Sequence, residues 1–207
     1  MNRSASQAVV SGLHSQLVLG RRLRVLSEQT LKLLPESGTV LDVGCGNGVI
    51  SRLIMDSRPQ LSIQGIDVLK RPSCAIPMDI YDGDHFPFED KSIDTVMFMD
   101  VLHHTDDAMS LLKEAARVSR QSIVIKDHLC DSAIAIRILA FMDWIGNRSH
   151  GVRLPYNYWS TEQWQQAWAQ LGVEPDAWVT DIGLYPWFAK PLFENDLHFL
   201  ARIPAST

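Results

Sequence analysis

The segment Val40–Ile50, with the sequence VLDVGCGNGVI, constrains the fold of this chain more than any other. An apolar run at residues 39–43 predicts a short buried strand, and a helical pattern of apolar residues begins at Ile50. Glycine permits a positive φ and places no Cβ on the inner side of such a turn, so a flat ligand can approach the backbone amides near the helix N-terminus. Three glycines occupy alternate positions between the strand and the helix: Gly44, Gly46 and Gly48.

Two aspartates indicate which ligand this turn would take. Asp42 enters the turn, where we expect a fixed negative charge that repels a pyrophosphate and suits a cationic ligand. Asp67 ends the run LSIQGID, where a second parallel strand should finish and a carboxylate can accept hydrogen bonds from ribose hydroxyls. The dinucleotide fingerprint fails because Val49 replaces its third glycine, and no GKS or GKT follows to form a P-loop. The plainer alternative is a tight turn beside a solvated strand end.

This stretch resembles the class I S-adenosylmethionine-dependent methyltransferases, particularly the small bacterial type that acts on small molecules. The resemblance extends from about Leu23 to Leu129 and includes an acid, Asp82, five residues before Pro87. Phe86 replaces the leucine that the family usually has in this motif. The resemblance implies S-adenosylmethionine as the cofactor, bound by Asp42, Gly44, Cys45, Gly46, Gly48, Asp67, Val68, Asp82, Gly83, Asp100 and His103.

Alternating strands and helices predict an α/β fold with a parallel sheet and right-handed crossovers. We expect helices at 13–34, 47–57 and 106–119, and strands at 39–44, 61–67, 76–81, 94–100, 122–127 and 197–203. By the resemblance, the fold is a doubly wound, mostly parallel seven-stranded sheet whose C-terminal strand is antiparallel. We expect one domain over residues 1–207, with an N-terminal helical cap at 1–38, a cofactor-binding half at 39–129 and an acceptor-side half at 130–207.

Composition is typical of a compact intracellular enzyme. Of 207 residues, 46% are hydrophobic and 21% are charged, and the net charge of −5 argues against a nucleic-acid partner. The three cysteines lack metal or redox spacing, and we interpret Cys45 as a small packing residue. No secretory signal is visible, and the apolar stretch Ala133–Ile145 is too short to span a bilayer. We therefore expect a cytoplasmic protein with no membrane span; the sequence carries no indication of its oligomeric state.

The C-terminal third contains all six tryptophans. Trp164 and Trp168 recur at helical spacing and predict core packing, on a helix that starts with a capping box at Ser160 and ends at Gly172. The preceding loop at 146–160, GNRSHGVRLPYNYWS, combines hydrogen-bonding groups with aromatic rings. Because it follows the fifth strand, we predict an aromatic-rich lid over the carboxyl edge of the sheet, with a structural Ω-loop as the alternative. The predicted acceptor pocket contains Asn147, His150, Tyr158 and Tyr185.

Candidate catalytic residues follow two strand ends at the same edge. Methyl transfer from a sulfonium is an in-line displacement that mainly needs alignment, helped by a base of near-neutral pKa. We expect His104 to be that base, with His128 as its competitor and with Tyr156 and Asn157 orienting the acceptor. Helix capping or a core hydrogen bond is the alternative role for either histidine. A zinc site from His103, His104 and His128 is conceivable, but no cysteine or carboxylate spacing supports it, so no metal site is expected.

These features predict an enzyme that transfers a methyl group from S-adenosylmethionine to a small molecule. Two other functions stay open: a non-methylating cyclisation of the cofactor that releases methylthioadenosine, and a non-catalytic cofactor-binding module. The sequence after the fourth strand lacks the DPPY or NPPY motif of nucleic-acid amino-methylating enzymes, and no GxSxG elbow is present.

Overall fold

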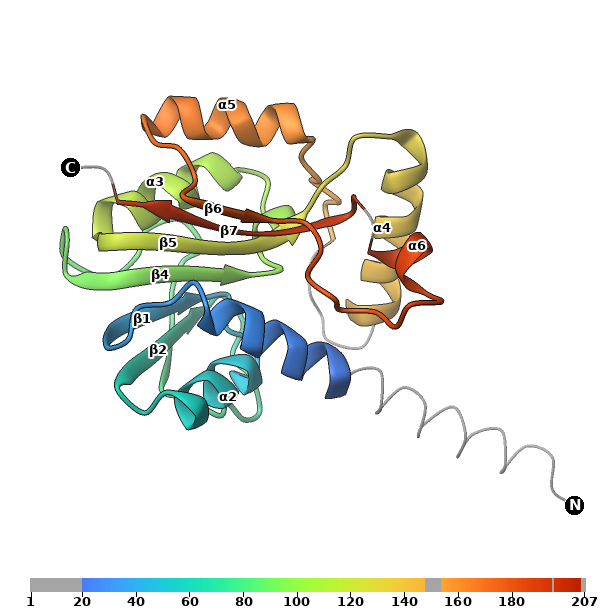
Figure 1. Ribbon diagram of the computed structural model, residues 1–207. Coiled ribbons are helices and arrows are strands. Elements are labelled where there is room, and N and C mark those ends of the chain that lie inside the picture. The colour runs from blue at the N-terminus through green and yellow to red at the C-terminus, as the bar shows by residue number, and fades with distance from the viewer. Residues whose placement is uncertain (1–19, 148–153, 195, 206–207) are drawn as a thin grey trace, which may run out of the picture.

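The computed structural model describes residues 20–147, 154–194 and 196–205, which form a seven-stranded sheet with helices on both faces (Figure 1). The strands follow the spatial order β3-β2-β1-β4-β5-β7-β6. β1 to β5 are parallel, and β7 runs antiparallel to both β5 and β6. The strands are β1 (Gly38–Val43), β2 (Leu61–Asp67), β3 (Met78–Ile80), β4 (Ile93–Met99), β5 (Ser119–His128), β6 (Ala177–Val179) and β7 (His198–Pro204).

The predicted sheet is confirmed, including its antiparallel C-terminal strand. The first helix, described over residues 20–31, ends before the predicted position 34. The helix expected at 106–119 begins later: Asp107 is the N-cap of α3, with its carboxylate accepting from the Ser110 amide at 3.0 Å, and Asp106 lies outside the helix. The other helices are α2 (Val49–Ser57), the 3₁₀ turn η1 (Leu102–His104), α3 (Ala108–Val118), α4 (Ala133–Asn147), α5 (Thr161–Leu171) and α6 (Lys190–Phe193).

Two apolar layers bury the two faces of the sheet, with α3 and α5 on one side and the N-terminal helix and α2 on the other (Figure 1). Adjacent strand residues point to opposite layers: Leu41 belongs to the layer under α3 and α5, and Val40 to the layer under α2. Burial on both faces explains why these strands read as continuous apolar runs.

The predicted tryptophan packing is confirmed. Trp164 and Trp168 are almost fully buried, and their rings stack with centroids 5.2 Å apart. The Trp164 indole donates to the backbone carbonyl of His128 at 3.2 Å, which ties α5 to the carboxyl end of β5. The capping box of Ser160 with Gln163 is present, and Gly172 ends α5 with a φ of 68°.

The carboxyl ends of the parallel strands meet at one edge of the sheet, as they must in an open α/β fold. α4 lies beyond the ends of β4 and β5, on the same side of the molecule as α6 (Figure 1). Within the described ranges, no helix has the length and apolarity needed to cross a membrane.

Candidate functional site

The glycine-rich turn after β1 has the predicted backbone. Gly44, Gly46 and Gly48 have φ values of 69°, 57° and 69°, in the left-handed region that favours glycine. A Cβ at Gly44 would lie 2.8 Å from the Val101 side chain, so this glycine allows the turn to approach the end of β4. A Cβ at Gly46 would meet no atom of the described chain within 4 Å. The inner side of the turn at Gly46 therefore faces open space.

Asp67 fixes the turn from the end of β2. Its Oδ2 accepts from the Gly46 amide at 2.9 Å, and its Oδ1 accepts from the Leu69 amide at 2.8 Å. The side chain is 4% exposed. A carboxylate has about four lone-pair directions, so the two amides leave two of them, and the Arg71 guanidinium lies 3.9 Å from Oδ2.

Asp42 does not supply the fixed negative charge that we expected. Burial raises the pKa of its carboxyl to about 7, with Asp67 adding to the shift and a hydrogen bond from Ser51 opposing it. Oδ2 accepts from the Ser51 hydroxyl at 2.5 Å, whereas the buried Oδ1 has no hydrogen-bond partner among the described residues. The charge at this position thus changes near neutral pH, and a cationic ligand would favour the ionised form. Burial also raises the pKa of the Cys45 thiol, in agreement with a packing role rather than a nucleophile.

The loops after β2 and β3 carry further residues that were predicted to contact the cofactor. Asp82 accepts from the amides of Asp84 and His85 at 2.9 and 2.8 Å, and these backbone hydrogen bonds lower its pKa. Gly83 has a φ of 96°, and a Cβ there would lie 3.2 Å from Val68. Val68 is 52% exposed. The structure thus brings Val68 and Gly83 together beside the turn that Asp82 caps.

Asp100 directly follows β4 and forms ion pairs with two basic side chains. Arg22 donates to its Oδ2 at 2.6 Å, and the fully buried Lys126 donates to its Oδ1. Burial alone would raise the pKa of Asp100, but Lys126 and Arg22 outweigh it and hold this pKa well below the usual range. The residue has a φ of 60°, which is uncommon outside glycine and costs about 1–3 kcal/mol. Its predicted cofactor contact stays a prediction.

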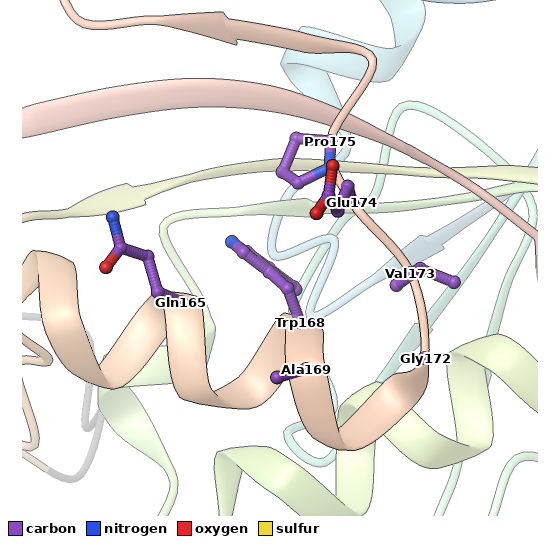
Figure 2. Close-up of a pocket in the computed structure, with 7 residues that line it drawn as sticks. All are labelled: Gln165, Trp168, Ala169, Gly172, Val173, Glu174 and Pro175. Atoms are coloured by element: carbon purple, nitrogen blue, oxygen red, sulfur yellow. The ribbon is translucent and has the colours of Figure 1, made fainter.

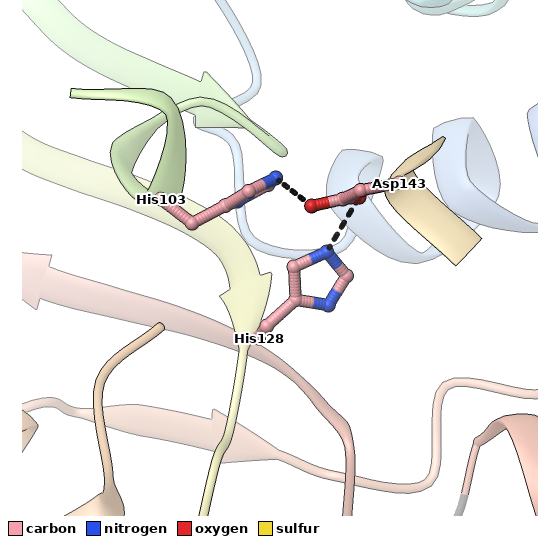
Figure 3. Close-up of side chains that lie close together, drawn as sticks. All are labelled: His103, His128 and Asp143. Atoms are coloured by element: carbon pink, nitrogen blue, oxygen red, sulfur yellow. Dashed lines mark ion pairs between the residues drawn. The ribbon is translucent and has the colours of Figure 1, made fainter. Parts of the chain in front are cut away.

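A buried cluster brings together His103 of η1, His128 at the end of β5 and Asp143 of α4 (Figure 3). The ring atom Nδ1 of His103 lies 2.7 Å from Asp127 Oδ1, and its Nε2 lies 3.3 Å from Asp143 Oδ2. Burial would lower the pKa of His103, but Asp127 and Asp143 raise it to about 10. Burial beside Lys126 lowers the pKa of His128 well below its usual value. His103, assigned by resemblance to the cofactor, is therefore part of an internal polar network.

His104, the predicted base, is less enclosed than its neighbours. Its ring centroid lies 4.0 Å from that of His103, and burial together with the charge on His103 lowers its pKa. Its Nδ1 is buried with no hydrogen-bond partner among the described residues. A neutral imidazole of this kind can accept a proton near neutral pH.

Three residues that were predicted to contact the acceptor have different surroundings. Tyr158 lies inside the cluster, where its hydroxyl donates to Asp143 Oδ2 at 2.5 Å and its ring stacks on His103. Asn157 holds the loop against η1, because its side-chain amide donates to the Thr105 carbonyl at 3.0 Å. Tyr156 is 40% exposed and has a φ of 56°.

Tyr185 lies on the far side of the same network. Its ring stacks on His198 at a centroid distance of 6.2 Å, and Arg22 Nη1 lies 3.5 Å from its hydroxyl. Asn147 is the last residue of α4, and its side chain is not described. His150 lies outside the described residues, so its predicted role in the pocket and lid stays a prediction.

Several functional candidates were missed from the sequence: Arg22, Lys126, Asp127, Asp143 and His198. Two of them carried a signal. Lys126 interrupts the apolar run of β5, and Asp143 is the one acid in the apolar stretch Ala133–Ile145. A buried charge in an apolar element needs a partner, so both positions implied an internal ion pair.

A separate surface pocket lies at the C-terminal end of α5 (Figure 2). Its lining includes Trp168, Gly172 and Val173. Because α5 begins beside the carboxyl end of β5, this pocket lies at the opposite end of the helix from the cluster.

A sequence model described as a methyltransferase domain matches residues 18–177, which is more than half of the chain. The chain belongs to this methyltransferase domain family. The membership confirms the predicted resemblance to the methyltransferase family.

Individual relatives differ in the acceptors that their names state. The tRNA U34 carboxymethyltransferase of Nautilia profundicola is 33% identical over 94 residues, which cover 38% of this chain and 30% of that protein. The ubiquinone/menaquinone biosynthesis C-methyltransferase of Desulfotalea psychrophila is 31% identical over 93 residues, covering 41% of this chain and 38% of that protein. The chain thus spans about a third of the length of these curated relatives.

A solved structure shows the shared fold. Geranyl diphosphate C-methyltransferase from Streptomyces coelicolor, solved with S-adenosyl-L-homocysteine, matches with a TM-score of 0.63 at 13% identity. The match covers 87% of this chain and 75% of that one.

Proposed function

We propose that this methyltransferase transfers a methyl group from S-adenosylmethionine to a small-molecule acceptor. The observation that supports a small acceptor is the enclosure of the polar groups at the carboxyl edge. His103 and His128 are each 3% exposed, Asp143 of α4 is 8% exposed, and the Tyr158 ring stacks on His103. An acceptor that reaches this cluster must itself be enclosed by the protein.

The residues of the glycine turn fit the proposed cofactor. The open side of Gly46 leaves room for a flat nucleoside, and Asp67 has two acceptor directions left for ribose hydroxyls. Asp42, whose pKa is raised to about 7, would ionise beside a ligand that bears ammonium and sulfonium charges. Val68 and Gly83 offer an apolar surface beside Asp82 for the base.

On the acceptor side, this chain contributes orientation, exclusion of water and a proton acceptor. The half-buried His104, with its lowered pKa, takes the proton from an acceptor hydroxyl or amine. Tyr156 and Asn157 belong to the segment that η1 holds in place, where they orient the acceptor. The bound cofactor supplies an electrophilic methyl group.

The experiment compares two acceptor pools with the same purified protein and methyl-labelled S-adenosylmethionine. A small-molecule filtrate of cell extract should give S-adenosylhomocysteine and a labelled small product, detected by mass spectrometry. The Asp67→Asn variant serves as the control for cofactor-dependent turnover.

Other outcomes identify the alternatives. Label in tRNA, with none in the filtrate, would contradict the acceptor class and favour an acceptor like that in the name of the Nautilia relative. Methylthioadenosine formed without any acceptor would indicate cyclisation of the cofactor. Cofactor binding with no product from either pool would indicate a non-catalytic module.

A further inference from the structure

Three ligand-type side chains from separate parts of the chain converge at the carboxyl edge of the sheet. His103 comes from η1, His128 from the end of β5 and Asp143 from α4, and they point toward one another (Figure 3). One atom from each lies within 4.8 Å of the others. His103 Nε2 lies 3.3 Å from Asp143 Oδ2, and His128 Nε2 lies 3.8 Å from Asp143 Oδ1.

The tautomer of His128 is fixed by its neighbour. His198 Nε2 lies 3.0 Å from the Phe193 carbonyl oxygen, which can only accept, so this nitrogen carries a proton. In a neutral imidazole the other nitrogen, His198 Nδ1, is then an acceptor, and the Lys126 Nζ lies 3.2 Å from it. His128 Nδ1 lies 2.9 Å from that acceptor and must donate. His128 Nε2 is therefore left with a lone pair directed toward the cluster.

His103 is oriented by a carboxylate in the same way. Its Nδ1 donates to Asp127 Oδ1 at 2.7 Å. Asp127 is itself held by the amides of Leu102 and His128, at 2.9 and 2.8 Å. His103 Nε2 is buried 3.3 Å from Asp143 Oδ2, with no hydrogen bond of normal geometry within the described part of the chain, and a metal ion would displace the proton that this nitrogen carries in the ion-free protein. A histidine with one nitrogen on a carboxylate and the other directed into a polar cluster is the usual arrangement of a metal ligand.

We propose that His103 Nε2, His128 Nε2 and the Asp143 carboxylate bind a divalent transition-metal ion. Ligand atoms that lie 2.0–2.2 Å from a tetrahedral metal are about 3.4 Å apart, which is close to the 3.3 and 3.8 Å from the two imidazoles to Asp143, whereas the remaining separation, within 4.8 Å, would shorten on binding. The Tyr158 hydroxyl donates to Asp143 Oδ2 and so orients this carboxylate toward the ion.

The ligand set also indicates what kind of site this is. Two imidazoles and one carboxylate suit Zn²⁺ or Fe²⁺ better than Mg²⁺ or Ca²⁺, which prefer oxygen ligands. Three protein ligands leave at least one coordination position, as in catalytic metal sites. The next step rests on the proposed function. The open coordination position would take a heteroatom of the acceptor, so the site favours acceptors with a hydroxyl or another oxygen donor.

The test measures metal binding in the untagged full-length protein after chelator treatment. Equilibrium dialysis against Zn²⁺ should give one ion per chain. Co²⁺ should give visible absorption bands, and NMR of that complex should show two paramagnetically shifted imidazole N–H signals, from His103 and His128. The NMR measurement uses the parent protein, so its result does not depend on whether a variant folds.

Variants then assign the ligands. His128→Gln and Asp143→Asn should each weaken Zn²⁺ binding at least about 100-fold. Tyr158→Phe should weaken it by about 10- to 100-fold, the usual effect of removing a hydrogen bond to a metal ligand. His85→Gln is the matched control, because His85 is exposed and pairs with Glu114 outside the cluster. Circular dichroism and cofactor affinity report whether each variant is folded.

The outcomes separate this proposal from the proposed function. A parent that binds no ion, or Zn²⁺ binding that survives in both ligand variants, would overturn the metal site while leaving methyl transfer intact. One bound ion with no turnover on any acceptor would retain the site and refute the proposed acceptor reaction. Binding lost equally in His85→Gln would place the ion elsewhere and count against the three ligands.

Discussion

Replacing Asp67 by asparagine tests the cofactor site most directly. The substitution keeps the shape and one carbonyl oxygen but removes the charge and turns one acceptor into an NH₂ donor. That donor would face the amide of Gly46 or Leu69, each of which now donates to the carboxylate. The variant therefore loses one anchor of the glycine turn and one charge-assisted hydrogen bond to a ribose hydroxyl.

The magnitude follows from the ribose contact. A hydrogen bond to a charged group contributes about 1.5–3 kcal/mol, and each 1.4 kcal/mol is about tenfold in affinity. The dissociation constant for S-adenosylmethionine should rise by about 10- to 150-fold. Leaving one backbone amide without its acceptor should also lower the free energy of unfolding by about 1–3 kcal/mol.

Isothermal titration calorimetry with S-adenosylmethionine and with S-adenosylhomocysteine measures the first effect, and urea unfolding measures the second. Asp79→Asn is the matched control, because Asp79 lies in the neighbouring strand β3 and accepts from Gln64 at the exposed surface. The reasoning is refuted if Asp67→Asn binds the cofactor like the parent, or if Asp79→Asn loses as much affinity.

Three further substitutions test the two sides of the site. Gly46→Val should abolish detectable cofactor binding in calorimetry, because its side chain enters the open space of the turn; unchanged binding would place the cofactor elsewhere. The carboxyl of Asp42 has its pKa raised to about 7 against about 4 in the unfolded chain, so its protonated form stabilises the fold below pH 4 and this stability is lost as pH rises to 7. Urea unfolding should show the parent losing stability relative to Asp42→Asn over that window; a constant difference would contradict the shift. His104→Ala should spare cofactor affinity and lower kcat by about 100- to 10,000-fold, measured as S-adenosylhomocysteine release, whereas an unaltered kcat would indicate alignment alone.

The sequence was most informative where local geometry determines structure. Some features depend only on residues close together in the chain, so their patterns predicted the observed elements. They are the glycine turn, the ends of β1 near Asp42 and of β2 at Asp67, and the capping box at Ser160. The helix α4 was not predicted, because its apolar residues surround the helix and give no single face. The strand β6 has only three residues, too few for a periodic pattern.

The contacts within the histidine cluster could not be predicted from the sequence. His103 and Asp143 lie forty positions apart, and His128 meets His198 only because β5 and β7 pair in one register. Spacing rules for metal ligands apply to residues on one turn or helix, and here each side chain comes from a different element. The state of Asp42 was missed for a related reason, because its pKa depends on burial by segments distant in the sequence.

The segment after β4 connects the two sides of the site physically. Val101 packs on the inner side of Gly44, the backbone amide of Leu102 donates to Asp127, and His103 donates to the same carboxylate. Asp100 begins this segment in a left-handed conformation that its ion pairs with Arg22 and Lys126 compensate. The N-terminal helix, which carries Arg22, thus contacts the segment that links the glycine turn to the histidine cluster. Alignment of a methyl donor with its acceptor is sensitive to a displacement of about 1 Å, so under the proposed function we expect substitutions at Arg22 to lower kcat more than cofactor affinity.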